Sequence, residues 1–330
     1  MKEIQIQINE NLEFINSILL TSHFNSLTKP LVGFPLMTDA ENDYTSAIRS
    51  FFREFQDHKV YRVIEGMIPK GFLFSRPVEI ALSLGKRDFA VRLPLSPLCI
   101  DYSGGMTKIG ELLEEMKDLS ETSLYFDFFE SQKSFYRDFL KKAEETLSFR
   151  PAEVLEEEFG KEQNSYHYVI SSLMNGNFGI SFREPQAEKA DLFSVFTADS
   201  FSLSPAVLFH EFSHPFINPL TEKNAALVHQ YREAYGKLAP YRLPDYRSGY
   251  GDWEECVNEH LVRAMAVHLL KKCRFNELSE ELFRMDFESG YRYLPLILEK
   301  YEYYDRSRGV YADFEAYLPE LLKVFSENIG

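Results

Sequence analysis

Residues 204–220 read SPAVLFHEFSHPFINPL, and the pattern H-E-x-x-H at positions 210–214 sets the expectations for the whole chain. On a helix, His210 and His214 lie one turn apart on one face, where two imidazoles can share a zinc ion. Glu211 is rotated by about 100° from His210, so we expect it near the water that the metal activates, as a general base. The alternative is two helix histidines beside a solvated carboxylate. The apolar flanks of the motif favour the metal site, because buried charges need partners.

Pro215 follows the second histidine directly. Proline has no backbone N–H to continue the helical hydrogen bonds, so we expect the motif helix to kink or end there. The segment FINP would then form a turn.

A zinc site of this kind needs a third protein ligand from outside the motif helix. The extended pattern H-E-x-x-H-x-x-G-x-x-H is absent, because Ile217 and Leu220 occupy its Gly and last His positions. The best source is the stretch GDWEECVNEHLVRAMAVHLL, residues 251–270, which opens a helix predicted to run from 253 to about 272.

Two glutamates of this second helix are candidates for the third ligand. Asp252 and Glu255 form a capping-box pattern, which gives Glu255 a structural role. Glu259 lies in an apolar run, where a carboxylate needs a metal or a cation. We therefore predict Glu259 as the ligand, and Arg263, four residues on, as its partner or as a contact to a substrate carbonyl. A plain Glu259–Arg263 ion pair is the alternative, and Glu255 stays open as the ligand.

Stabilising an oxyanion requires a donor besides the metal. Tyr246 and Tyr250, in the Gly/Pro-rich loop before the second helix, are the candidates, together with Arg263. His229 is a weaker candidate as ligand or donor. Tyrosines of such a loop also commonly serve packing alone. We expect His260 and His268, which point to other faces of their helix, to be core or surface histidines.

The composition excludes several classes of protein. The net charge is −15 and no long basic run occurs, so neither nucleic acid nor an anionic membrane is an expected partner. Three cysteines without CxxC spacing indicate neither a disulfide framework nor a structural zinc site. No apolar stretch has transmembrane length, and the N-terminus lacks a clear signal peptide, so we expect a cytoplasmic protein unless a leader was removed.

The pattern of elements predicts an α+β protein that divides near Pro151. Residues 1–150 are expected to be mainly helical, with no assignable role, although 61–72 and 78–84 are ambiguous between helix and strand. Residues 151–330 are expected to form the catalytic domain. Its segments YHYVISSL, NFGISF and LFSVFT read as strands of one sheet, and the Asn-Gly pair in MNGN predicts a hairpin between the first two.

The segments HEFSH and NEHLVRA together resemble the H-E-x-x-H and downstream N-E motifs of thermolysin-like enzymes, the gluzincin branch of the zincin superfamily of metallopeptidases. The sequence departs from that pattern in a longer spacing from His214 to Glu259 and in Arg263, which stands in the region of a family aspartate. A closer resemblance is to an uncharacterised bacterial family, domain of unknown function 4932, through FHEFSHPFINP, the NFG segment and EHLVRA. Members of that family are regarded as candidate metallopeptidases.

The resemblance implies a zincin-like core, in which a mostly antiparallel sheet packs on the H-E-x-x-H helix and on a Glu-bearing helix. It implies His210 and His214 as ligands, Glu211 as base and Glu259 as third ligand. It also implies an edge strand able to pair with an extended peptide.

These expectations favour a zinc-dependent metallopeptidase with one Zn²⁺ per chain and a peptide or protein substrate. The alternative from another class is a peptide-binding or scaffold protein that keeps the fold with little turnover. The intact H-E-x-x-H pattern argues against that alternative.

Overall fold

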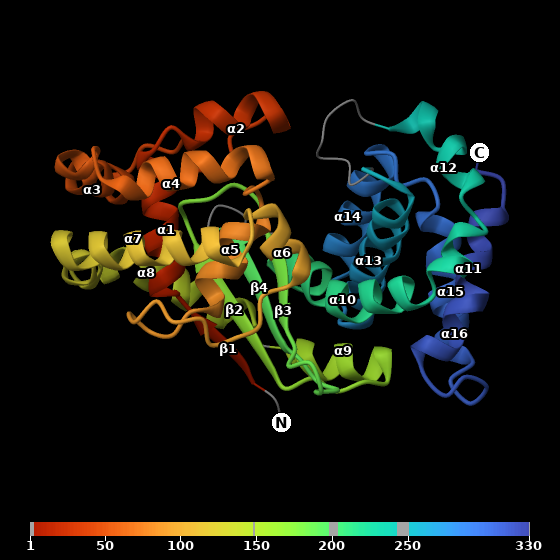
Figure 1. Cartoon of the computed structure of the whole chain (residues 1–330). Coiled ribbons are helices and arrows are strands. Elements are labelled where there is room, and N and C mark those ends of the chain that lie inside the picture. The colour runs from red at the N-terminus through yellow and green to blue at the C-terminus, as the bar shows by residue number, and fades with distance from the viewer. Residues whose placement is uncertain (1–2, 148, 198–203, 243–250, 330) are drawn as a thin grey trace. The chain divides into compact units, whose positions relative to one another are not determined.

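Helices dominate the chain, and within the described residues the strands form one mixed four-stranded sheet (Figure 1). The structure, a computed structural model, describes residues 3–147, 149–197, 204–242 and 251–329. The α+β class is confirmed. The expectation of a mostly antiparallel sheet is replaced by a small mixed sheet in a mainly helical protein.

The chain divides into two compact units. The sheet unit comprises residues 5–145 and 167–201, and the motif unit comprises residues 146–166 and 202–330 with the N-terminal end of the chain. Residues 167–201, which composition assigns to the second domain, therefore group by packing with the N-terminal helices. The catalytic role predicted for residues 151–330 stays a prediction. Since the strands and the motif helix belong to different units, a zincin-like core is not established by this architecture.

Eight helices of the described residues precede Arg150. They are α1 Glu10–Thr21, α2 Phe24–Val32, α3 Asp43–Phe51, α4 Lys59–Met67, α5 Ser75–Ser83, α6 Pro97–Tyr102, α7 Met106–Ser123 and α8 Tyr125–Thr146. The described part of residues 1–150 is mainly helical, and the ambiguous segments 61–72 and 78–84 lie largely in α4 and α5. Side-chain caps start several of these helices. Asn42 accepts from the Thr45 N–H at 2.9 Å, and the Thr45 hydroxyl accepts from the Asn42 N–H, which completes a capping box.

The sheet has the strand order β1-β2-β4-β3. Its strands are β1 Ile4–Gln7, β2 Ser165–Ser171, β3 Phe178–Phe182 and β4 Asp191–Thr197. β3 pairs antiparallel with β4, with Phe178 opposite Val195. β2 and β3 are not neighbours, so the predicted hairpin between them is wrong. The segment between β2 and β3 is instead hydrogen-bonded to other parts of the chain. Asn175 donates to the Met37 carbonyl at 3.1 Å, and Asn177 accepts from the Thr197 N–H at 3.0 Å.

A carboxyl group lies in the core of the sheet unit. Glu13 of α1 is 0% exposed, and three hydroxyl groups donate to it. Tyr44 donates to Oε2 at 2.9 Å, Tyr136 donates to the same oxygen, and Ser171 donates to Oε1 at 2.6 Å. These bonds favour the ionised form, but burial outweighs them and raises the pKa of Glu13 to about 7.

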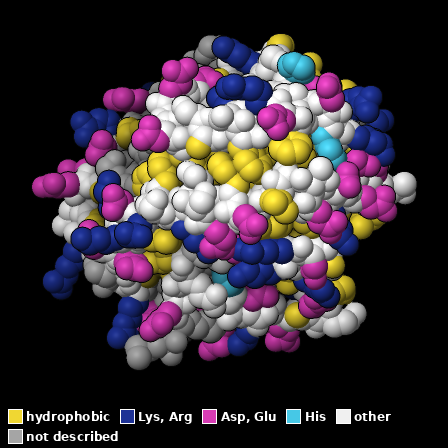
Figure 2. Space-filling model, turned by 90° about the vertical axis from the view of Figure 1, so that its left-hand side faces the viewer, with side chains coloured by type: hydrophobic (Ala, Val, Ile, Leu, Met, Phe, Trp, Pro, Cys, Tyr) yellow, Lys and Arg dark blue, Asp and Glu magenta, His cyan; other side chains and the backbone are white. Residues whose placement is uncertain are grey.

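The face shown in Figure 2 carries a band of hydrophobic side chains across its middle. Acidic and basic side chains are interspersed around this band rather than separated into fields of one sign. Every described helix is too short or too polar to cross a bilayer.

The motif unit is helical. Its helices are α9 Pro151–Phe159, α10 Ser204–Lys223, α11 Ala225–His229, α12 Glu233–Lys237, α13 Trp253–Lys272, α14 Asn276–Glu288, α15 Leu294–Arg306 and α16 Phe314–Leu321. α13 has the predicted bounds.

The motif helix α10 continues through Pro215 and Pro219 to Lys223. We expected the helix to kink or end at Pro215, with FINP in a turn. The predicted end at Pro215 and the predicted turn are both wrong. Each proline removes one helical hydrogen bond, at a cost of about 3 kcal/mol. Packing offsets this cost, since the helix is apolar on both flanks of the motif and Phe212 and Phe216 beside Pro215 are buried. Phe216 stacks on Phe159 of α9 with ring centroids 4.4 Å apart.

Candidate metal centre

Two long helices, α10 and α13, pack along each other and carry the motif residues. Both lie within the motif unit. The Thr221 hydroxyl of α10 donates to the Asn258 amide oxygen of α13 at 2.5 Å, which fixes their alignment next to Glu259. At the start of α13, Trp253 is 1% exposed and its indole N–H donates to the Val228 carbonyl at 2.8 Å. The helix that bears Glu259 is thus anchored at its first turn.

The structure brings His210, His214 and Glu259 together. The Nε2 atoms of the two histidines are 3.2 Å apart. Glu259 Oε1 lies 3.5 Å from His214 Nε2, and Glu259 Oε2 lies 3.9 Å from His210 Nε2. The three side chains are 16–19% exposed. Glu211 joins the group as well, because its carboxylate and the two imidazoles place one ligand atom each within 4.8 Å of one another.

This donor set fits a zinc ion. Zinc–nitrogen bonds of about 2.0–2.1 Å in a tetrahedral site place two ligand nitrogens roughly 3.3 Å apart. The observed 3.2 Å between the histidine nitrogens is close to that value, and the distances to Glu259 need only a small adjustment. Two imidazoles and one carboxylate leave a fourth position open, as catalytic zinc sites do.

The electrostatics keep the groups in the states that metal binding requires. Burial lowers the pKa of His210 to about 3, so this imidazole is neutral at pH 7 and its nitrogen can act as a ligand. Burial would raise the pKa of Glu259, but Arg263 and the two histidines outweigh it and hold the pKa at about 2. Glu259 is therefore an anion over the whole physiological range.

Asn218, which the sequence analysis did not single out, orients His214. Its amide oxygen lies 3.3 Å from His214 Nδ1 and accepts the ring N–H, which leaves Nε2 as the lone-pair nitrogen facing His210 and Glu259. A signal was present in the sequence, since Asn218 stands four residues after His214 on the same helix face.

Replacing Asn218 with alanine is expected to weaken zinc binding by about 10–100-fold, the usual effect of removing a group that holds a metal-ligating histidine. Competition with a fluorescent zinc chelator measures this change. The matched control is Asn224→Ala, since Asn224 contacts the Leu220 carbonyl instead of a histidine. Equal affinities of the two variants would rule out an orienting role for Asn218.

Arg263 is held on two sides in addition to its contact with Glu259. Its Nε donates to Glu259 Oε2 at 3.0 Å, and its Nη1 donates to Asp286 Oδ1 at 2.5 Å. The guanidinium lies over the ring of Tyr291, 4.3 Å from its centroid. Asp286 and Tyr291 were missed by sequence analysis, because they follow on later elements. The predicted Glu259–Arg263 contact is present, and Glu259 faces the histidines at the same time. A catalytic role for Arg263 stays a prediction.

Glu255 lies at the start of α13. Its N–H donates to the Asp252 side chain at 2.8 Å, and its own carboxylate accepts from the Gly251 N–H at 2.9 Å. In a capping box the Glu255 carboxylate would accept from the N–H of the N-cap residue Asp252, but here it accepts from the N–H of Gly251, one residue earlier. Glu255 therefore caps the helix.

The other residues singled out from the sequence are three histidines and two tyrosines. His229 lies 2.7 Å from Glu254, and His260 is buried with its Nδ1 2.8 Å from the Cys256 carbonyl. His268 is also buried, as expected of a core histidine. Tyr246 and Tyr250 lie outside the described residues, so their predicted role stays a prediction.

The model of a family described as "Domain of unknown function (DUF4932)" matches residues 4–324. No curated protein and no solved structure matches the chain.

Proposed function

The chain belongs to the DUF4932 family, whose description assigns no activity, and from its site we propose that it is a zinc-dependent hydrolase that cleaves peptide bonds. The observation that carries the proposal is the convergence of His210, His214 and Glu259 at distances of 3.2–3.9 Å from two separate helices. Membership of the zincin superfamily and a peptide substrate rest on the resemblance of HEFSH and NEHLVRA to the gluzincin motifs.

Each residue has a role in this proposal. His210, His214 and Glu259 hold one Zn²⁺, which supplies Lewis acidity toward a carbonyl group and toward water. Glu211 takes the proton of the attacking water and passes it to the leaving amine. Its 7% exposure provides the dry surroundings in which a carboxylate is an effective base. Arg263 keeps Glu259 ionised and oriented, which makes it a positioning residue as well as the predicted substrate contact.

A carbonyl oxygen that becomes negatively charged needs a further donor. Tyr246 or Tyr250 fills this role in the proposal, because the segment that bears them leads directly into α13. Their phenylalanine variants would lose turnover while binding zinc normally.

Elemental analysis of protein purified without chelators is expected to find about one zinc per chain in the wild type. His214→Ala and Glu259→Ala remove ligands and are expected to lower the zinc content to near zero. Glu255→Ala is the matched control, because this carboxylate caps the same helix.

Wild-type protein that stays free of zinc after soaking would rule out the metal site. Loss of zinc in Glu255→Ala with retention in Glu259→Ala would show that the ligand was assigned to the wrong glutamate. If the zinc-loaded wild type cleaves no member of a peptide library, the peptidase proposal is wrong and the protein is a metal-containing binding protein.

A further inference from the structure

A pocket lies in the motif unit, between α13, α14 and α15. It has a volume of about 340 Å³, which lies in the range of small-molecule sites, and none of the proposed metal ligands lines it. Val267, Phe283 and Leu298 contribute apolar wall, one residue from each helix. Such a wall favours a ligand with an apolar body.

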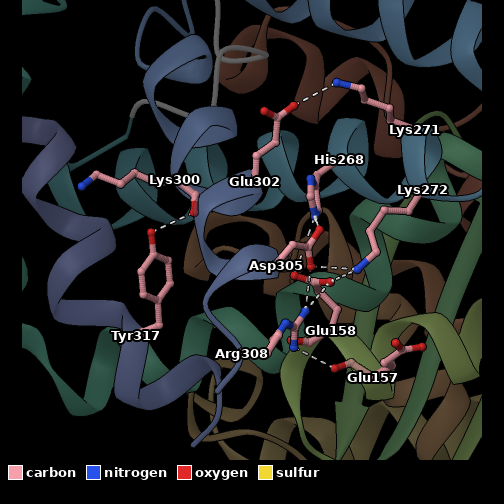
Figure 3. Close-up of polar contacts among 10 residues, drawn as sticks. All are labelled: Glu157, Glu158, His268, Lys271, Lys272, Lys300, Glu302, Asp305, Arg308 and Tyr317. Atoms are coloured by element: carbon pink, nitrogen blue, oxygen red, sulfur yellow. Dashed lines mark hydrogen bonds and ion pairs between the residues drawn. The ribbon is translucent and has the colours of Figure 1, made fainter. Parts of the chain in front are cut away.

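His268 supplies a buried polar group to this pocket. The side chain is 4% exposed, and its Nε2 lies 3.0 Å from Asp305 Oδ2 and 3.8 Å from Glu158 Oε1. The other ring nitrogen points away from these carboxylates, toward the side where Glu302 lies (Figure 3). Since Nε2 faces two carboxylates, we assign the ring proton to Nε2, and Nδ1 is then a hydrogen-bond acceptor.

Two cationic side chains compensate the negative charges of Glu158 and Asp305, the carboxylates next to His268. Lys272 lies 2.7 Å from Glu158 Oε2 and 3.0 Å from Asp305 Oδ1. Arg308 Nη2 contacts the same two oxygens at 2.7 and 3.2 Å (Figure 3). The group Glu158, His268 and Asp305 has the composition of a metal site, but Lys272 and Arg308 already compensate the charges of its two carboxylates. Asp305, whose Oδ2 lies 3.0 Å from Nε2, holds the imidazole in its orientation.

The rim of the pocket disfavours an anionic ligand. Lys271 is bound to Glu302 at 2.9 Å, so its charge is compensated. Glu280 adds a further carboxylate to the lining. A carboxylic acid or a phosphate would meet net negative charge there.

From these contacts we infer that this pocket binds a small, mainly apolar molecule with one hydroxyl donor, of the phenol or alcohol class. The apolar body packs between Val267, Phe283 and Leu298, and the hydroxyl donates to His268 Nδ1. The site is independent of the proposed hydrolase function.

The test uses p-cresol as probe and 4-fluorotoluene as its matched partner, which has nearly the same shape but no donor. Methyl-labelled wild-type protein is titrated and followed by NMR. We expect p-cresol to shift the methyl signals of Val267 and Leu298 with a dissociation constant on the order of 1 mM, and 4-fluorotoluene to bind about tenfold more weakly. Nuclear Overhauser contacts between p-cresol and Leu298 would locate the ligand without any substitution.

Leu298→Trp fills the pocket and is expected to abolish the shift at Val267. Val310→Trp introduces the same side chain at a position that is 75% exposed and serves as the control. Equal binding of the two probes, p-cresol binding that persists in a folded Leu298→Trp variant, or wild-type shifts that avoid Val267 and Leu298 would each overturn the inference.

Discussion

Replacing Glu211 with glutamine is expected to lower the rate of hydrolysis by about 10²–10⁴-fold, the contribution of a positioned general base. Glutamine keeps the size and shape of the side chain but cannot accept the proton. Because His210, His214 and Glu259 are untouched, the variant should bind zinc as the wild type does. Digestion of a peptide library followed by mass spectrometry measures turnover, and elemental analysis measures zinc.

Glu222→Gln is the matched control, since Glu222 is an exposed carboxylate on the same helix α10. We expect this variant to keep wild-type turnover. Turnover of Glu211→Gln at a tenth of the wild-type rate or better would exclude Glu211 as the base.

The second large effect is expected at Glu13, where Glu13→Gln should remove a pH dependence of stability. The pKa of Glu13 is about 7 in the folded protein, against 4.5 as the unperturbed value. The folded chain therefore holds this proton more tightly than the unfolded chain. The free energy of unfolding should fall by roughly 3 kcal/mol as the pH rises from about 4.5 through about 7. Burial of the charge causes the loss, and Tyr44, Tyr136 and Ser171 reduce it.

Urea unfolding at about pH 5 and about pH 7.5 measures this difference. In Glu13→Gln the contribution should disappear, because the amide does not titrate. Glu10→Gln is the control on the same helix: Arg87 lowers the pKa of Glu10 despite its partial burial, so its contribution has the opposite sign. A wild type and a Glu13→Gln variant with the same pH dependence would show that Glu13 is not the titrating group.

The secondary structure of the motif unit was largely predictable, because its signals are local. Asp252 as cap and the apolar run after it fixed α13 at residues 253–272. The pairing of strands was not predictable in the same way. An Asn-Gly pair commonly marks a hairpin, but here Asn175 and Asn177 bond to distant backbone groups. The alternation of apolar and polar residues in Ile4–Gln7 is a pattern typical of a strand.

The candidate metal site, too, was predictable only where its signals are local. Helical spacing predicted that His210 and His214 share a face, and the need to compensate a buried carboxylate singled out Glu259. Asp286 and Tyr291, which surround Arg263, could not be found this way, because only the packing of later elements on α13 brings them near. Pro215 misled the prediction because its local cost was weighed without the tertiary packing of α10.

The anchored start of α13 has a spectroscopic consequence. Trp253 is the only tryptophan of the chain, and it belongs to the motif unit. Its indole is buried against Phe325, with ring centroids 5.2 Å apart, and bonded to Val228. Tryptophan emission therefore reports one half of the molecule alone, six residues from Glu259. Circular dichroism averages over both halves, so a mismatch between the two signals during unfolding would show that the halves melt separately.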